Sequence, residues 1–194
     1  LGEYPKALLH YQQALAISKQ IGDKAGEGTT LNNIGLAYQT LGEYQQAEKT
    51  LFLAIEALES LREASLTDNQ KISLFEIQSH TYRFLQQALI AQNKVDKALE
   101  VSERSRGRAL VDLLASKLPN SANRQSDKLP SIQVIKQIAQ QQSSTLVQYS
   151  LIDNVYQVKS KEKKSTELYI WVVKPTGEIT FKKVDIESLN KPLQ

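Results

Sequence analysis

Apolar residues recur every three or four positions along most of residues 1–118, which is the spacing of amphipathic helices. The clearest run is TTLNNIGLAYQTLGEYQQAEKTLFLAIEAL, residues 29–58. Its first half places one set of residues on a single helical face: Leu31, Ile34, Gly35 and Tyr38. After a break at Leu41-Gly42, its second half does the same with Ala47, Leu51, Ala54 and Ile55. Two amphipathic helices joined by a short glycine turn predict a helical hairpin.

The phrase LGEY occurs twice, at residues 1–4 and 41–44, and each copy precedes a helical run. The second copy is the turn inside the hairpin, so residues 1–20 are expected to be a half repeat, a second helix without its first. Three of its residues then match members of the later helix: Ala7 with Ala47, Tyr11 with Leu51, and Ala14 with Ala54. We expect a fragment of a longer chain; the alternative is a natural start on a half repeat.

The hairpin resembles a known repeat. Its residues follow the tetratricopeptide (TPR) pattern W-x2-L-G-x2-Y…A-x3-F, with Leu31 in place of Trp and Leu51 in place of Phe. The usual closing Pro is absent, and the period exceeds the common ~34 residues, as in long-repeat TPR proteins. The resemblance implies a mainly α fold, a TPR helical-hairpin array (α-solenoid) over residues 1–118, with one repeat at about 28–66.

A degenerate repeat is expected at about 68–117. NKVDKAL (93–99) aligns with GEYPKAL (2–8), which places the preceding apolar residues Tyr82, Leu85 and Leu89 on a first helix. That helix is expected to begin early, with Asp68 as its N-cap. Its partner is expected to run from about Val95 to Lys117.

The pattern changes after the helices. Residues 119–130 read as a polar linker, and SIQVIKQIAQQQ (131–142) predicts a helix. LYIWVV (168–173) is typical of a strand covered on both faces, and PTGE favours a tight reversal into EITFKKV. TLVQYSL places Val147, Tyr149 and Leu151 on one face, whereas KSKEKKSTE is expected to be a solvated excursion between strands. A short α/β segment with an antiparallel β-meander follows from this.

The long helix and its continuation resemble a second family. ALEVSERSRGRALVDLLA is similar to the segment that joins TPR arrays to CHAT domains, the caspase-like domains that follow TPRs in many bacterial proteins. The subsequent linker, helix and strands fit the same order. The resemblance implies that residues 131–194 are the N-terminal part of a CHAT-like α/β domain, truncated, with any catalytic His and Cys beyond residue 194.

Composition excludes several functions. The chain has no cysteine, and its two histidines, His10 and His80, lie in the helical part, so we expect no enzyme activity for this chain, no cofactor and no metal. GDKAGEGTT (22–30) lacks the ending of a phosphate loop and is interpreted as a linker between helices. The net charge of +3 is too small to argue for nucleic acid or membrane partners. Neither a signal sequence nor a spanning segment is recognised, and a cytoplasmic location is expected.

First helices of stacked TPR hairpins line a concave groove that binds extended peptides or partner helices. By repeat register, the following residues are expected to face it: Asn32, Asn33, Leu36, Gln39, His80, Arg83 and Gln87. An asparagine can pair with any peptide main chain because it carries both a donor and an acceptor, and resembling TPR proteins often use the position of Asn33 in this way. Ordinary solvation is the alternative, with equal weight at Asn32 and Gln39. The unpaired first helix should expose an apolar stripe that a second copy could cover, which would give a homodimer.

Three residues of the long helix, Arg104, Gly107 and Arg108, are candidates for docking it against the following domain. A glycine inside a helix costs about 1 kcal/mol relative to alanine, which close packing would explain. The alternative is solvent exposure with local ion pairs, Arg104 with Glu100 and Arg108 with Asp112.

These patterns predict a protein–protein interaction module that binds a protein or peptide ligand, the sensing or tethering part of a larger TPR-CHAT protein. Two alternatives stay open. The parent could be an active caspase-like cysteine peptidase whose His and Cys lie beyond residue 194, or a scaffold with a degenerate CHAT domain that never cuts.

Overall fold

The structure is a computed structural model that describes residues 3–61, 67–117, 131–158 and 161–186. The chain forms two compact units, Leu1–Ala109 and Leu110–Gln194. The expected linker at 119–130 and the last residues of the expected CHAT-like segment lie outside the described residues.

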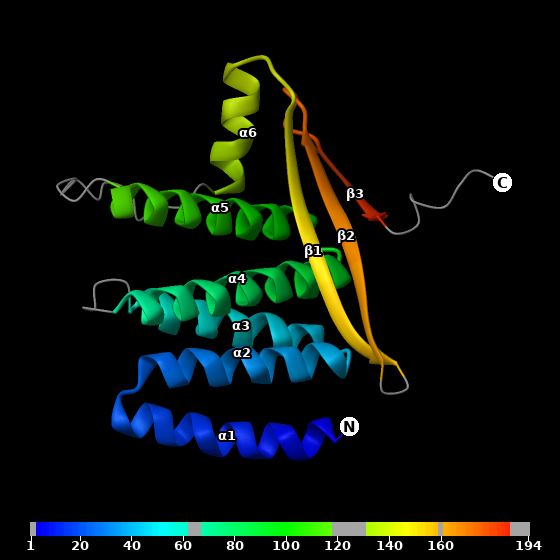
Figure 1. Cartoon of the computed structure of the whole chain (residues 1–194). Coiled ribbons are helices and arrows are strands. Elements are labelled where there is room, and N and C mark those ends of the chain that lie inside the picture. Colours follow the sequence, from blue (N-terminus) through cyan, green and yellow to red (C-terminus); the bar gives the residue numbers. More distant parts are fainter. Residues whose placement is uncertain (1–2, 62–66, 118–130, 159–160, 187–194) are drawn as a thin grey trace. The chain divides into compact units, whose positions relative to one another are not determined.

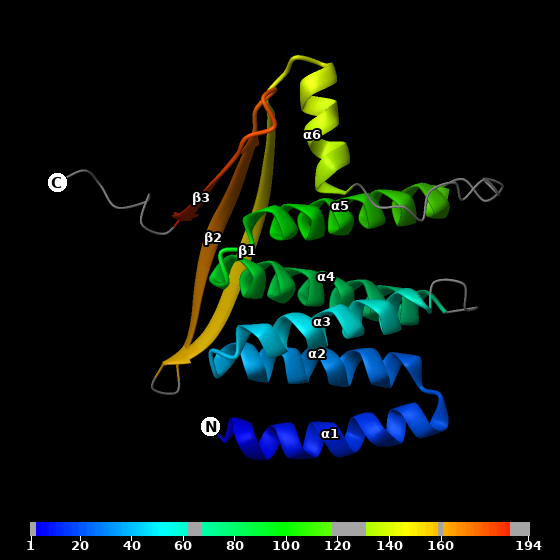
Figure 2. The same cartoon turned by 180° about the vertical axis from the view of Figure 1, so that it is seen from behind.

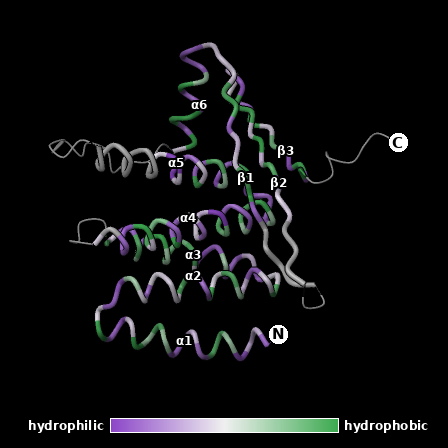
Figure 3. The backbone as a smooth tube through the Cα atoms, viewed as in Figure 1, coloured by the Kyte–Doolittle hydropathy of each residue, from purple (hydrophilic) through white to green (hydrophobic). Residues whose placement is uncertain are grey.

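The first unit is a stack of helices (Figure 1). Its members are α1 (Tyr4–Ile21), α2 (Lys24–Thr40), α3 (Tyr44–Glu59), α4 (Asp68–Ala91) and α5 (Val95–Lys117), and α5 continues past Ala109 into the second unit. Helix α2 packs against α1, α3 and α4, and α3 also packs against α4, as the view from behind shows (Figure 2). Hydrophobic and hydrophilic residues alternate along α1, α2, α3 and α4 (Figure 3), as in amphipathic helices that pack through part of their surface. The prediction of a helical-hairpin array is confirmed.

The turns between the helices share one geometry. Gly22 after α1, Gly42 after α2 and Asn93 after α4 take left-handed backbone angles, with φ of 72°, 77° and 59°. In each case the next residue donates its backbone N–H to the carbonyl five residues earlier, at 2.9 Å. This arrangement closes a helix end by satisfying its last carbonyls, and it favours Gly or Asn because other side chains strain there. The alignment of NKVDKAL with the glycine turns therefore has a structural basis.

The Glu-Tyr pairs of the two LGEY copies occupy equivalent places. Tyr4 begins α1 and Tyr44 begins α3, each preceded by a glutamate at the N-cap. Helix α1 is thus the counterpart of α3, as the interpretation of residues 1–20 as a second helix requires.

Small residues let α2 and α3 approach closely. Ala47 and Ala54 are fully buried, and Gly35 is buried beside the fully buried Leu51. A Cβ added to Gly35 would lie 2.5 Å from Leu51 Cδ2, far inside a normal contact, and one added to Gly28 would lie 2.5 Å from Leu58 Cδ2. Small residues at these positions are therefore what allows the two helices to lie this close.

The predicted start of α2 was wrong, whereas α4 begins at Asp68 as expected but has a different cap. Helix α2 begins at Lys24, before the expected position of about 28, because the Asp23 side chain accepts a hydrogen bond from the Gly26 N–H at 2.9 Å. Most of GDKAGEGTT is therefore helix and not linker. Helix α4 is capped by Thr67 and not by Asp68: Thr67 and Gln70 exchange hydrogen bonds in a capping box.

The second unit pairs one helix with a sheet. Helix α6 (Ile132–Gln141), capped by Ser131, buries Ile135 and Ala139 and contacts the sheet. The sheet has the order β1 (Leu146–Val158), β2 (Lys161–Val173), β3 (Ile179–Asp185), with antiparallel neighbours. The predicted antiparallel meander is confirmed. The predicted excursion at KSKEKKSTE was wrong, because most of it extends β2 in register with residues 153–158 of β1.

The two faces of the sheet differ. One face buries Tyr169, Trp171 and Val173 of β2, with Ile152 opposite on β1. Rings of Tyr169 and Trp171 pack edge to face at 5.9 Å, and both contact the Phe181 ring of β3. The other face carries the β1 residues that the sequence grouped together, Val147, Tyr149 and Leu151, and they are 47%, 58% and 62% exposed.

Candidate functional site

Two side-chain hydrogen bonds join α2 to α4, and they lie two helical turns apart along α2. The Thr81 hydroxyl donates to Asn32 Oδ1 at 3.0 Å, and Gln39 Nε2 donates to Gln87 Oε1 at 3.1 Å. They fix how the first helices of successive hairpins sit beside each other. The structure therefore brings together three residues of the predicted groove, Asn32, Gln39 and Gln87, and adds Thr81.

Asn32 differs from its expected place. It is only 8% exposed, and its carbonyl is committed to Thr81, itself fully buried. A polar side chain at this buried position is tolerated because it has a hydrogen-bond partner in the next hairpin. Asn32 therefore holds the two helices together and is not placed to contact a ligand.

On α2, the residues beside these contacts remain accessible. Asn33 is half-buried, and Leu36 is 38% exposed although it is apolar. The Gln39 Oε1 atom is buried and receives no hydrogen bond from the residues that the structure describes.

On α4, three side chains form a small cluster. The Arg83 guanidinium lies 5.5 Å from the centre of the Phe84 ring, and the His80 ring lies 6.3 Å from the same ring. Burial lowers the pKa of His80, and the positive charge of Arg83 lowers it further, while Glu76 opposes the shift. The sequence interpretation missed Phe84; its place next to Arg83, one turn after His80, was the available signal. We call Asn33, Leu36, Gln39, His80, Arg83, Phe84 and Gln87 the α2/α4 surface.

Arg104 forms an ion pair inside the helical unit. Its guanidinium binds the Glu59 carboxylate through two nitrogens, with Nε at 3.2 Å, and Glu59 also accepts a hydrogen bond from the Tyr82 hydroxyl at 2.7 Å. Burial would lower the pKa of Arg104, but the Glu59 hydrogen bond raises it overall. The pair joins α5 to α3, which is a different partner from the local Glu100 that was the alternative, and the junction role for Arg104 stays a prediction.

The other two junction candidates are Gly107 and Arg108. A Cβ added to Gly107 would meet no described atom within 4 Å, so the helical unit itself gives no close contact there, and packing against the following domain stays a prediction. The side chain of Arg108 lies outside the described residues.

A second ion pair ties α3 to the start of α5. The Glu48 carboxylate, with a side chain only 11% exposed, binds Lys94, and Lys97 lies 3.7 Å away. Burial alone would raise the pKa of Glu48, but the hydrogen bond from Lys94 and the nearby positive charges lower it overall. This contact is structural and lies away from the α2/α4 surface.

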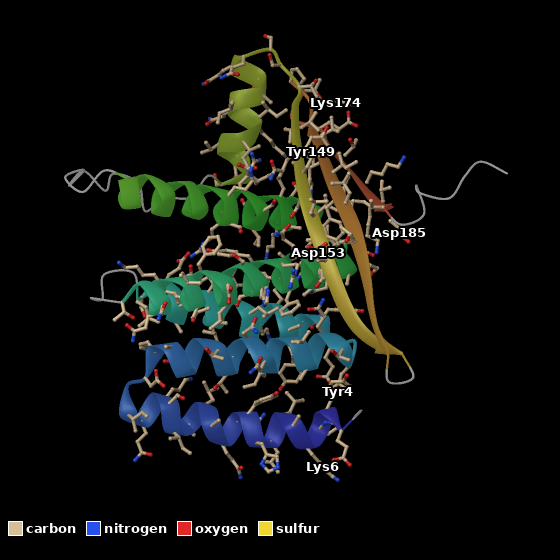
Figure 4. All side chains as sticks on the ribbon, in the orientation of Figure 1. Tyr4, Lys6, Tyr149, Asp153, Lys174 and Asp185 are labelled. Atoms are coloured by element: carbon tan, nitrogen blue, oxygen red, sulfur yellow. The ribbon has the colours of Figure 1, made fainter. Side chains whose placement is uncertain are left out.

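One face of α1 is exposed to solvent, whereas the equivalent face of α3 is buried. Ala14 and Ile17 are exposed, Ile17 by 58%, whereas their counterparts Ala54 and Ala57 are 0% and 6% exposed. The difference arises because α3 packs against both α2 and α4, whereas α1 packs mainly against α2, with Leu15 also reaching the cluster of Leu31, Ala54 and Ala57. Figure 4 shows Tyr4 and Lys6 on the first turn of this helix.

Chemistry other than binding finds little support in the part of the chain that the structure describes. It contains no cluster of three His, Asp or Glu side chains that could hold a metal ion. A cavity of about 270 Å³ lies between the end of α3 and the start of α4, lined mainly by Leu58, Leu61, Leu74 and Ile77, and none of the predicted site residues lines it. None of the described helices has the length and apolar character that crossing a bilayer demands.

The fold and the α2/α4 surface define a helical-repeat protein of stacked hairpins. The sequence model of the Tetratricopeptide repeat family matches residues 1–64. Tetratricopeptide repeat protein 28 from Mus musculus is 28% identical over 160 residues, and the Homo sapiens protein of the same name is 28% identical over 159 residues. These matches cover 82% and 81% of this chain but only 6% of either relative. No solved structure matches the chain with statistical significance.

The similarity to tetratricopeptide repeats is thus shown for residues 1–64, and the two relatives, which carry the same repeat in their name, support it. The stretch matched in each relative is longer than the helical unit, so the similarity also includes part of residues 110–194. Stacked repeats of this kind present extended surfaces for other proteins.

Proposed function

We propose that this chain is a protein–protein interaction module that binds an extended peptide or a partner helix along the α2/α4 surface. The observation that carries the proposal is the pair of hydrogen bonds, Thr81 to Asn32 and Gln39 to Gln87, which fixes both helices before a ligand arrives. A surface that is already ordered loses less entropy on binding, so more of the contact energy appears as affinity.

The surface offers three kinds of contact. The half-buried Asn33 can both donate to and accept from a peptide main chain, and the partly exposed Gln39 amide belongs to the same surface. Leu36 offers an apolar contact for a ligand side chain. Arg83, stacked on Phe84, can pair with a carboxylate of the ligand.

Peptide selection followed by affinity measurement tests this proposal. Phage-displayed peptides of about 12 residues, long enough to span a repeat groove when extended, are selected on the whole chain. Fluorescence anisotropy then measures the dissociation constant of the best peptide. Asn33→Ala and Arg83→Ala should each weaken binding at least fivefold, with unchanged circular dichroism. Lys49→Ala, an exposed change on α3, is the matched control and should leave the dissociation constant within twofold. Equal affinities for all four proteins would remove this surface from the binding site.

The second unit extends the proposal. Residues 131–194 are proposed to be the beginning of a CHAT-like α/β domain, so that the repeats sense or tether a partner for a larger TPR-CHAT protein in the cytoplasm. The order of helix, β1, β2 and β3 supports this assignment. The peptidase alternative requires a His and a Cys in the parent, since this chain has no cysteine. The parent sequence beyond residue 194 decides between them: a His followed by a Cys at strand ends favours the peptidase, and their absence favours the scaffold.

The open face of α1 supports a weaker proposal, a homodimer through this helix. Ile17 and Ile21 are 58% and 69% exposed on it. Ile17→Glu should then shift a concentration-dependent dimer toward monomer in sedimentation velocity. A dimer that Ile17→Glu leaves unchanged would exclude α1 as its interface.

A further inference from the structure

Strand β1 is an edge strand, paired only with β2 in the sheet order β1-β2-β3. Its outer backbone N–H and C=O groups form no ladder with any other described strand, so this edge can accept another strand. Its exposed face is apolar: Val147, Tyr149 and Leu151 are 47%, 58% and 62% exposed. Figure 4 shows Tyr149 on β1, with Asp153 further along the same strand.

The two edges of the sheet are protected differently. The other edge, β3, carries the exposed charges of Lys182, Lys183 and Asp185, which oppose edge-to-edge pairing. Residues 146–152 of β1, LVQYSLI, contain no charge and no proline. Asp153 marks the first charge, and it accepts a hydrogen bond from Thr166 of β2 at 2.8 Å. The unprotected stretch is therefore short and sharply bounded.

This stretch is complementary to itself when two copies run antiparallel about Tyr149. Its exposed face then pairs Val147 with Leu151 of the other copy, and Tyr149 with its own counterpart. Side chains directly opposite each other lie about 4.5–5.5 Å apart between Cβ atoms, so every exposed apolar residue gains an apolar neighbour.

In the same register, residues of like polarity also lie opposite each other on the other face of the strand. Leu146 faces Ile152, which is apolar against apolar, and Gln148 faces Ser150, which is polar against polar. A register shifted by two residues, centred on Leu151, places Tyr149 opposite the charged Asp153 instead. The pairing centred on Tyr149 thus places apolar opposite apolar and polar opposite polar residues on both faces, which favours a second copy of this strand as the partner.

We propose that β1 is a homotypic interface, at which two copies of this chain join their sheets antiparallel through residues 146–152. Such a contact is two-fold symmetric, so by itself it joins two copies and leaves no further β1 edge open. Three exposed side chains and one strand bury less than the ~800 Å² per partner of a standard stable interface, so the dimer should be reversible and dissociate on dilution. The proposal is independent of ligand binding at the α2/α4 surface.

Single-cysteine crosslinking tests the register directly, because the chain has no cysteine of its own. The variants Val147→Cys, Tyr149→Cys and Leu151→Cys are oxidised mildly, and the disulfide-linked dimer is followed on non-reducing gels. Tyr149→Cys should crosslink with itself at least tenfold faster than either of the others alone. A mixture of Val147→Cys with a size-tagged Leu151→Cys should form the mixed dimer at a rate near that of Tyr149→Cys, since antiparallel partners come within disulfide distance.

Sedimentation velocity provides the second measurement. Tyr149→Lys places two positive charges opposite each other and should weaken the dimer at least tenfold. Val134→Lys changes another exposed apolar residue of the same unit, on α6, and should leave the dimer unchanged. A wild-type chain that stays monomeric at all concentrations, or a dimer that Tyr149→Lys does not weaken, overturns the proposal. Equal crosslinking of all three cysteine variants overturns it as well.

Discussion

Because α2 and α3 lie so close together, replacing one helix glycine with alanine should lower the free energy of unfolding and not raise it. Replacing a helix glycine with alanine normally stabilises a helix by about 1 kcal/mol. At Gly35 the new Cβ would lie 2.5 Å from both Cγ and Cδ2 of Leu51, whose side chain is fully buried and cannot move into solvent. Overpacking of this kind costs about 1–3 kcal/mol. Gly35→Ala should therefore destabilise the chain by about 1 kcal/mol in net terms.

Two further substitutions test whether the clash with Leu51 causes the destabilisation: Gly107→Ala as a control and Leu51→Ala to remove the clash. Gly107→Ala meets no described atom within 4 Å and should stabilise by about 0.5–1 kcal/mol. Leu51→Ala alone should cost about 2–5 kcal/mol, because it opens a cavity in the core. With Leu51 truncated, the clash disappears, so Gly35→Ala in that background should be stabilising.

Urea unfolding followed by circular dichroism measures the free energies of the wild type, Gly35→Ala, Leu51→Ala and the double variant, which together form a double-mutant cycle. The reasoning requires that the effect of Gly35→Ala change sign between the wild-type background and the Leu51→Ala background. If Gly35→Ala stabilises the wild-type chain as much as Gly107→Ala does, α2 and α3 are not held at the distance described.

Three further predictions concern single contacts. Arg104→Met leaves the largely buried Glu59 without its two guanidinium hydrogen bonds and should lower the free energy of urea unfolding by about 2 kcal/mol; a loss below about 0.5 kcal/mol would mean that the pair is unimportant. Asp23→Ala removes the α2 cap and should cost about 1 kcal/mol in the same assay, with an unchanged value arguing against the early helix start. The hydrogen bond from Lys94 lowers the pKa of Glu48 despite burial. The ionised Glu48 therefore contributes its full stabilisation of the fold above pH 4.5, the ordinary pKa of a glutamate, and this contribution is lost as the pH falls below that value. Thermal melts should thus show a gap between wild type and Glu48→Gln at about pH 6 that narrows below pH ~4, and a constant gap would contradict the ionic role.

The sequence predicted the hairpin well because its signals are local. Leu31, Gly35, Ala47 and Leu51 recur at helical spacing, and such spacing reports directly which side of a helix is buried. The turn at Gly42 was equally clear, since a left-handed backbone there favours glycine. The start of α2 was missed because glycines at 26 and 28 suggest a loop, while one cap hydrogen bond at Asp23 is enough to begin the helix.

Contacts between distant residues were harder to foresee. Arg104 was assigned a local partner or a junction role, whereas its partner Glu59 lies 45 positions earlier in the chain. Asn32 and Asn33 are adjacent polar residues that the pattern treats alike, yet Asn32 is buried against Thr81 while Asn33 stays half-buried. In both cases the role of the residue depends on a partner far away in the sequence, and the spacing of residues along the chain does not identify that partner. The same holds for β2, where a charged segment forms a strand because β1 supplies its backbone partners.

The most direct test of a binding role is the footprint of a selected peptide on the whole chain. Amide hydrogen exchange, with and without the peptide, measures which backbone segments become protected. We expect added protection in residues 33–40 of α2 and 80–87 of α4, with little change in α1 or α3. Protection confined to α1, α3 or residues 131–186, with α2 and α4 unchanged, would contradict recognition at the α2/α4 surface.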